Sequence, residues 1–369
     1  MYTVSIRDAI FEYSIGIHMV QTMGLGTHSV FNLTLLLLLS SISGTTSNTF
    51  HIVTSLNAPC PGEFIGDPCL TLQQYVSNPS ISTDNVTLLF ESGNHTITST
   101  LSSSNANNFT MSGNNVEIQC SSSAIQITLT SVQHVHISGL SFTGCGSSTL
   151  GTNGRSVYLE NASFLRSGGI TVQNISQGVN ITDMVFSVNN YHITVSINDV
   201  SNGSVHLNNV VTDAGMIVGA VNRSIHFYNV EKRILSAIYY YTSTVTLQNA
   251  NSISLQNVVL SQRSTLTISS VRQMVQWSNV SISQSSSITI SSAGQMVQWS
   301  NVSISRGNAI TISSAGQLNM EDCTLQYIQS TSPALILSHI SMVTIARCGF
   351  SSNVSVSYTH LTLPTIYSV

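Results

Sequence analysis

The chain has 369 residues, of which 42% are hydrophobic and only 7% are Asp, Glu, Lys or Arg. An average soluble domain carries about 25% charged residues, so Ser, Thr and Asn must provide most of the polar surface here. This composition excludes coiled coils, long solvent-exposed helices and charge-rich disorder. With a net charge of -4 and Lys232 as the single lysine, no basic patch for nucleic acid or an anionic membrane surface is expected.

An apolar run over residues 30–42 contains five consecutive leucines and is too short to span a membrane. Small residues at Ser41 and Ser43 form a cleavage site typical of secretory signal peptides, although the usual Lys or Arg ahead of the run is missing. We therefore predict a signal peptide with an upstream extension over residues 1–43, with Met19 or Met23 as the true start. The mature chain is expected to be extracellular, with no membrane-inserted segment.

Internal repetition is the strongest signal in the sequence. QMVQWSNVSIS occurs at residues 273–283 and again at 295–305, so the offset is 295 - 273 = 22 residues. The same eight-residue frame recurs in ten copies, with first residues Val135, Val157, Val179, Val205, Ile225, Ile253, Val275, Val297, Leu318 and Val343. Positions one, three, six and eight of the frame are apolar at 38 of 40 places, which predicts strands with one buried face.

The fifth position of the frame predicts a bend in every copy. Nine of its ten residues are Gly, Asn or Asp, which tolerate a left-handed backbone, and the exception is Arg347. A further strand is expected about ten residues upstream of the frame, for example at 288–290 and 310–312. Three short strands per 22 residues, without helical periodicity, predict a coil that closes on itself and stacks on the next.

The constant step and the V-x-I-x-N-V-x-F frame resemble the right-handed parallel β-helix proteins of the pectin-lyase-like superfamily. The resemblance implies an all-β solenoid of about 22 residues per coil over residues 85–355. We predict an amino-terminal cap over residues 44–84, stapled by a disulfide between Cys60 and Cys69. Residues 356–369 include VSYTHLTLPT, which resembles a translated sequencing adapter, so we predict that this tail lies outside the fold.

Polysaccharide-cleaving enzymes of that superfamily carry Asp clusters on an exposed strand face, often with Arg or Lys nearby. No two of the seven aspartates are adjacent in this sequence. Glu160 and Asp183 fall on neighbouring coils and could form a retaining-type pair, but Asp183 is already accounted for as a bend residue. We therefore predict no catalytic residue, no metal site and no cofactor.

Outward positions two and four of the frame form a polar strip that is the best candidate for binding. Its predicted ligand-binding residues are His136, Tyr158, Glu160, His206, His226 and Tyr228, with Asn180 and Asn208 between them. Rings and amides stacked every ~4.8 Å suit a sugar ligand, whereas the alternative is a solvated polar ladder. Two functions remain: a secreted module that binds an extracellular glycan or protein, and a polysaccharide lyase or glycoside hydrolase. The missing acidic cluster favours the first.

The remaining predictions concern single residues. Cys323 and Cys348 share the sixth column on adjacent coils, within disulfide range although with poor torsion geometry, and we predict a bond there. The pairing of Cys120 and Cys145 stays open, and Lys232 in the eighth column is interpreted as a register irregularity.

Eleven Asn-x-Ser/Thr sites follow the signal peptide. We predict N-glycans at Asn85, Asn94, Asn202 and Asn222, which lie in loops or outside the frame. Low occupancy is expected at the bend residues Asn161, Asn279 and Asn301, whose side chains we predict to stack inward as a ladder.

Overall fold

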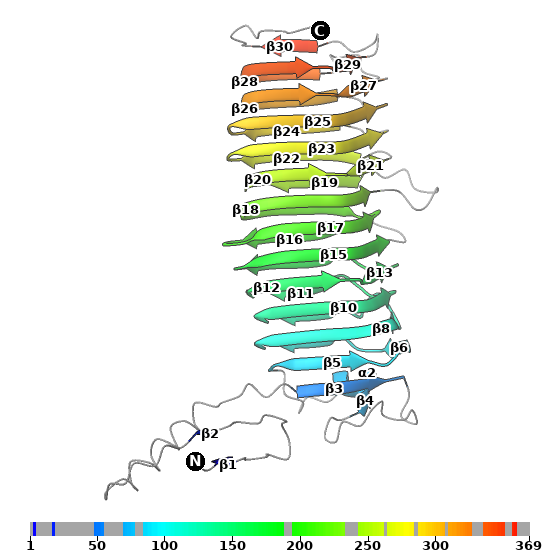
Figure 1. The fold of residues 1–369 in the computed structure, drawn as a ribbon. Helices are drawn as coiled ribbons and strands as arrows, with labels where there is room; N and C mark the ends of the chain where they lie inside the picture. Colours follow the sequence, from blue (N-terminus) through cyan, green and yellow to red (C-terminus); the bar gives the residue numbers. More distant parts are fainter. Residues whose placement is uncertain are drawn as a thin grey trace, which may run out of the picture.

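The computed structural model describes residues 3–4, 17–18, 48–54, 69–77, 84–187, 194–232, 243–261, 264–283, 287–306, 309–326, 335–350 and 356–359. Parallel strands of successive turns pair with one another and form a β-solenoid of about 11 turns with about 22 residues per turn. The turns stack as a column from β3 at the amino-terminal end to β30 at the other (Figure 1). The predicted fold class is confirmed.

The first turns contain β3 (Asn48–Val53), β4 (Cys69–Thr71), α2 (Leu72–Ser77), β5 (Val86–Phe90), β6 (Gly93–Ile97), β7 (Leu101–Ser104), β8 (Asn108–Cys120) and β9 (Ile127–Thr130). The middle turns contain β10 (His134–Thr143), β11 (Ser148–Thr152), β12 (Ser156–Glu160), β13 (Ser163–Leu165), β14 (Ile170–Ile175), β15 (Gly178–Ser187), β16 (Thr194–Val200), β17 (Ser204–Thr212) and β18 (Gly215–Lys232). A two-stranded antiparallel pair, β1 (Thr3–Val4) and β2 (Ile17–His18), is not part of this stack.

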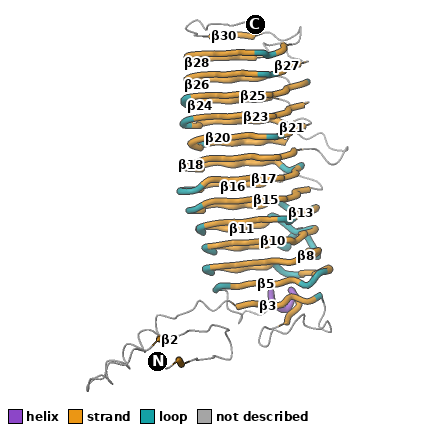
Figure 2. The backbone as a smooth tube through the Cα atoms, in the orientation of Figure 1, coloured by secondary structure: helices purple, strands orange, loops and turns teal. Residues whose placement is uncertain are grey.

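The last turns contain β19 (Ser243–Gln248), β20 (Ala250–Gln256), β21 (Val259–Ser261), β22 (Ser264–Val271), β23 (Met274–Ser283), β24 (Ser287–Ala293), β25 (Met296–Ser305), β26 (Ala309–Glu321), β27 (Thr324–Gln326), β28 (Leu335–Ala346), β29 (Gly349–Phe350) and β30 (Val356–Thr359). Strands make up most of each turn, and short loops join them at the corners (Figure 2).

Register confirms the repeat that the sequence predicts. The first residues of all ten frame copies pair with one another in a single column, from Val135 to Val343. Every one of them is buried, and the side chain that follows each of them along its strand faces outward. Because side chains alternate across a strand, one column in register fixes the inward and outward sets of the whole turn.

The predicted bend is present in every copy of the frame. All ten residues of the fifth column have positive φ, including Gly139 at 68° and the exception, Arg347, at 51°. A side chain is excluded at Gly139, because a Cβ there would lie 1.9 Å from the carbonyl oxygen of Gly113. A second column of positive φ, which the sequence frame does not include, runs through Asn153, Asn174, Asp199, Ala220, Asn249, Ser270, Ser292, Ser314 and His339.

Side chains of the fifth column form a hydrogen-bonded ladder. The Nδ2 of Asn209 donates to Asp183 Oδ1 at 2.7 Å, and Asn229 Nδ2 donates to Asn209 Oδ1 at 2.9 Å. Asn257, Asn279 and Asn301 extend the ladder, each donating to the residue before it. The ladder is exposed rather than inward as predicted, because the bend turns these side chains along the outer corner.

Aromatic rings stack inside the solenoid where the repeat places them in register. Trp277 and Trp299 are fully buried, with ring centroids 4.7 Å apart and an interplanar angle of 9°. Phe142, Phe164 and Phe186 form a similar stack, with centroid distances of 4.8 and 5.7 Å. The spacing between coils of about 4.8 Å lies in the centroid range of stacked aromatic pairs, so aromatic residues in one column can stack on one another.

Two segments predicted to lie outside the solenoid contribute strands to it. β3 falls in the predicted cap and pairs in parallel with β5, and the predicted adapter tail forms β30, which pairs with β28. Both segments alternate apolar and polar residues over at least three positions, which is sufficient to continue a parallel ladder onto an open edge.

Candidate functional site

The predicted strip is continuous in the structure. His136, Tyr158, Asn180, His206 and His226 pair in register from β10 through β12, β15 and β17 to β18. Their outward direction follows from the burial of the apolar residues on either side along each strand. The strip is therefore held on hydrogen-bonded strands, which makes it a rigid surface.

Two shallow hollows lie over this strip. The smaller, of about 420 Å³, is lined by His136, Tyr158, Leu159, Glu160, Asn180 and Thr182. The larger, of about 660 Å³, extends from Tyr158 to Tyr228 and includes Asn180, His206, Asn208, Arg223 and His226. Tyr158, Asn180 and Thr182 line both hollows, so the two form one continuous trough.

Exposed tyrosines mark the ends of the larger hollow. Tyr158 is 48% exposed and Tyr228 is 42% exposed, values that set them apart from the buried aromatic residues of the core. Three coil steps separate their rows, a span of roughly 14 Å. Tyrosine rings with one free face are typical contact surfaces for ligands that have an apolar side and a polar side.

The centre of the larger hollow contains a stacked pair of imidazoles. The rings of His206 and His226 lie 4.8 Å apart at an interplanar angle of 11°. The His226 Nε2 lies 2.7 Å from Ser224 Oγ, which in turn lies 2.8 Å from Ser204 Oγ. Burial lowers the pKa of both histidines, and the charge on His206 lowers the pKa of His226 further. Both rings are therefore mostly neutral at pH 7.

Charge is distributed unevenly along the trough. The smaller hollow contains Glu160, whose Oε2 lies 4.0 Å from His136 Nε2, with both side chains exposed. The larger hollow is lined by Arg223 and the two histidines, and no Asp or Glu is among its lining residues. Arg223 was not predicted from the sequence, because it precedes the eight-residue frame by two residues.

Glu160 and Asp183 have different partners in the structure. Asp183 has a φ of 52° and accepts the hydrogen bond from Asn209, so it serves the corner ladder. Glu160 instead lies near His136. Within the ranges that the structure describes, no group of three or more His, Cys, Asp or Glu side chains could hold a metal ion.

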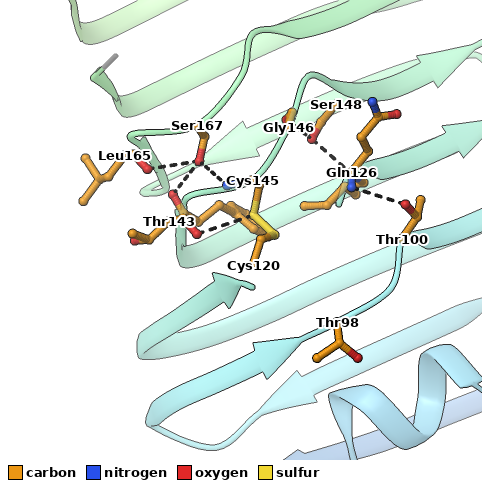
Figure 3. The surroundings of a disulfide bond; sticks show 12 residues. Thr98, Thr100, Cys120, Gln126, Thr143, Cys145, Gly146, Ser148, Leu165 and Ser167 are labelled. Atoms are coloured by element: carbon orange, nitrogen blue, oxygen red, sulfur yellow. Dashed lines mark hydrogen bonds between the residues drawn. A yellow bond between two sulfur atoms is a disulfide. The ribbon is translucent and has the colours of Figure 1, made fainter. Parts of the chain in front are cut away.

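The structure joins Cys120 to Cys145 by a disulfide with a Cα–Cα distance of 5.0 Å (Figure 3). Thr143 pairs with Gln119, so Cys145 lies one residue beyond the position in register with Cys120. The chain turns between Thr143 and Cys145, at Gly144, where φ is 71°. An offset pair can orient its Cβ atoms toward each other, which two parallel, in-register side chains cannot do.

The predicted bond between Cys323 and Cys348 is wrong, because both cysteines are free thiols. They occupy one column, and the backbone N–H of Cys323 points to Cys348 Sγ at 3.4 Å. A hydrogen bond from the Cys323 thiol lowers the pKa of Cys348 to about 7, while burial and the same contact raise that of Cys323. Cys69 is disulfide-bonded, and Cys60 lies outside the described residues.

The predicted register irregularity at Lys232 is also wrong. Lys232 pairs in register with Thr212 and Leu260, so no irregularity places it in the eighth column. The side chain is fully buried, and Nζ has no hydrogen-bond partner among the residues that the structure describes. Burial lowers the pKa of Lys232 to about 8, against the opposing attraction of Asp213.

The predicted glycan sites differ in accessibility. Asn94, Asn202 and Asn222 are exposed. Asn85 is only 7% exposed and accepts a hydrogen bond from Asn108 Nδ2 at 2.7 Å. It lies at a bend with a φ of 50°, immediately before β5, and the glycan expected there remains a prediction.

The geometry defines the class of protein as a parallel β-solenoid with a polar trough on one outer face. Comparisons with protein-family models, curated proteins and solved structures found no match. The predicted signal peptide lies almost wholly in residues that the structure does not describe. No helix in the described ranges has the length and apolar character needed to cross a membrane.

Proposed function

We propose that the chain is an extracellular binding module of the parallel β-helix type, secreted and N-glycosylated, which holds an acidic polysaccharide along the trough. The observation that carries this proposal is the larger hollow itself: two exposed tyrosines bound a surface that contains Arg223, His206 and His226 and has no carboxylate among its described lining residues. Tyrosine rings provide stacking surfaces for sugar rings, and the cationic and imidazole groups match acid groups between them.

The module binds and does not cleave its ligand. The polysaccharide lyase or hydrolase alternative needs acid and base groups beside the scissile bond. Asp183 is committed to the corner ladder, and Lys232, the one lysine, is fully buried in the core. A reducing-sugar assay on pectin, alginate and chondroitin sulfate is expected to show no release, and release would favour the enzyme.

Retention on columns of the same three polysaccharides tests binding. Tyr158→Ala and Tyr228→Ala are each expected to weaken binding about tenfold, the size of one lost aromatic contact. Met342→Ala is a matched control, because Met342 is 47% exposed but does not line the trough. If both tyrosine variants bind as tightly as the control does, the trough is not the binding surface.

Acidity should strengthen this binding. The histidine pKa values are lowered from the ordinary 6.5, so the rings gain charge only as the pH falls below that value. Uronate groups, like other carboxylates, stay ionised down to about pH 4. Retention should therefore rise from pH 7.5 to pH 5, and the double variant His206→Gln, His226→Gln should lose that rise.

A further inference from the structure

A glycosylation sequence lies within the trough. Asn180, Ile181 and Thr182 form an Asn-x-Thr site on β15. Asn180 and Thr182 are two residues apart on one strand and face outward together, while Ile181 between them is buried. Both outward residues line both hollows, so the site lies where the hollows join.

Asn180 differs from the sites at the corner. The amide nitrogens of Asn279 and Asn301 donate to the ladder, which holds their side chains along the edge. Asn180 has an exposed side chain, its Oδ1 accepts from Thr182 Oγ1 at 3.3 Å, and its Nδ2 donates no hydrogen bond among the described residues. A substituent on Nδ2 would therefore break no bond of the folded chain.

The neighbours of Asn180 determine where such a substituent would lie. Tyr158 is its register partner on one side and His206 on the other. Each lies one coil away, roughly 4.8 Å along the stack. The first sugar of a chain attached at Asn180 thus starts between an exposed tyrosine ring and the stacked imidazoles.

We infer that Asn180 is an N-glycosylation site whose glycan covers part of the trough and partly excludes other polysaccharides, so that the chain with this glycan binds them more weakly than the chain without it. In the modification, Asn180 Nδ2 forms a bond to the anomeric carbon of a lipid-pyrophosphate-linked oligosaccharide. The carbon–oxygen bond to the phosphate breaks, the lipid pyrophosphate leaves with that electron pair, and the amide nitrogen releases a proton. The exclusion step rests on the proposed function, whereas the modification itself does not.

The test uses the full chain made in a secreting, glycosylating cell and in a bacterium without glycosylation. Peptide mapping measures sugar occupancy at Asn180 and at Asn94, an exposed site on β6 far from the trough. We expect Asn180 to be occupied in the glycosylating cell. An unmodified Asn180 overturns the inference, and occupancy at Asn94 in the same sample would show that the chain had met the modifying enzyme.

Retention on the pectin, alginate and chondroitin sulfate columns then tests exclusion. From the glycosylating cell, Thr182→Ala should be retained at least tenfold more strongly than wild type, since it removes the sugar but keeps Asn180. Thr182→Ser, which preserves the site, should behave as wild type, and so should Thr96→Ala, which removes the Asn94 site.

Equal retention of Thr182→Ala and Thr182→Ser, with Asn180 occupied only in the second, would overturn exclusion. The bacterial wild-type protein reports on the proposed function separately. If it is not retained on any of the three columns, binding by the trough is refuted, while the peptide map still decides whether Asn180 is modified.

Discussion

The turns that contain the duplicated sequence, β22 to β25, and the turns that contain the trough, β10 to β18, have largely apolar interiors and different exteriors. Most inward residues are apolar and buried in both regions. Outward, the duplicated turns repeat Gln276 over Gln298 and Ser278 over Ser300, whereas the fourth column of the trough turns changes from Thr182 to Asn208 to Tyr228. The inward columns thus determine the path of the chain and leave the outward columns free to form a binding surface.

The interior of the trough region is less uniform than that of the duplicated region. Where the duplicated turns place Ile282 and Ile304 in the eighth column, the trough turns place Thr212 and Lys232, both fully buried. This polar interruption lies on β17 and β18, beyond the bend that follows the trough residues, and the paired strands β23 and β25 have Ile282 and Ile304 in the same column.

The largest expected effect comes from shortening the duplicated region. Deletion of residues 273–294 removes one complete turn and joins Arg272 to Gln295, so every later strand keeps its register. Deletion of residues 273–283 removes half a turn and leaves the following strands without their partners. Because the energies of stacked turns are nearly local, we expect the first variant to fold and the second to unfold.

Far-ultraviolet circular dichroism and thermal melting distinguish the two deletions. The full-turn deletion should retain the wild-type β-sheet spectrum and a cooperative transition, and the half-turn deletion should lose both. Identical spectra and melting temperatures for the two variants would contradict independent turns.

The next largest effect on stability compares a buried aromatic residue with an exposed one. Trp299→Ala should destabilise the fold by about 3 to 5 kcal/mol, the range for a buried aromatic, because it removes one side of the stack with Trp277. Tyr158→Ala on the exposed strip should change stability by less than about 0.5 kcal/mol. Denaturant titration measures both, and native tryptophan emission should be blue-shifted and resistant to quenching. Water-like emission would contradict the burial.

Lys232 tests the interruption of the core in the trough region. The pKa of its amine falls from 10.5 in the unfolded chain to about 8 in the fold, so folding favours the neutral form. Above pH 10.5 this preference costs no free energy of folding. The cost grows as the pH falls from 10.5 to 8, and it is constant below pH 8. A shift of this size corresponds to about 3 kcal/mol at neutral pH.

Lys232→Met should therefore stabilise the fold by up to about 3 kcal/mol at pH 7, with the gain shrinking as the pH rises toward 10.5. Denaturant titrations of both proteins at pH 7 and pH 10.5 provide the measurement. A gain that does not change with pH would show that folding does not shift the pKa of Lys232.

Much of the fold could be predicted from the sequence because a repeat constrains many positions at once. The step of 22 residues predicted the register from Val135 to Val343, and the Asn column predicted the bend. Position two of the frame also predicted five trough residues, because outward direction follows from strand alternation alone.

What the sequence could not provide depends on small displacements between turns. The bond from Cys120 to Cys145 needs an offset of one residue, and column matching favours the in-register pair Cys323 and Cys348 instead. Arg223 lies outside the frame, so no column marks it. Lys232 contradicted the hydrophobic pattern, and only the register showed that the chain accepts a buried lysine there.

The smallest expected effect concerns the corner ladder, which crosses both regions. Asn229 in the trough turns and Asn279 in the duplicated turns each donate to one neighbour and accept from the other. Their φ values, 51° and 54°, are almost the same. If the corner is independent of the outward sequence, the same substitution should have the same effect at both positions.

Substitution by Gly keeps the left-handed backbone and removes the exposed hydrogen bonds, at an expected loss of about 0.5 to 1 kcal/mol. Substitution by Ala also places a Cβ in that conformation and should increase the loss of stability by about 1 kcal/mol. We would measure Asn229→Gly, Asn229→Ala, Asn279→Gly and Asn279→Ala by denaturant titration in bacterially produced protein. A loss of stability on substitution by Gly that is much larger at Asn229 than at Asn279 would mean that the trough depends on its corner. The two regions would then not share one independent frame.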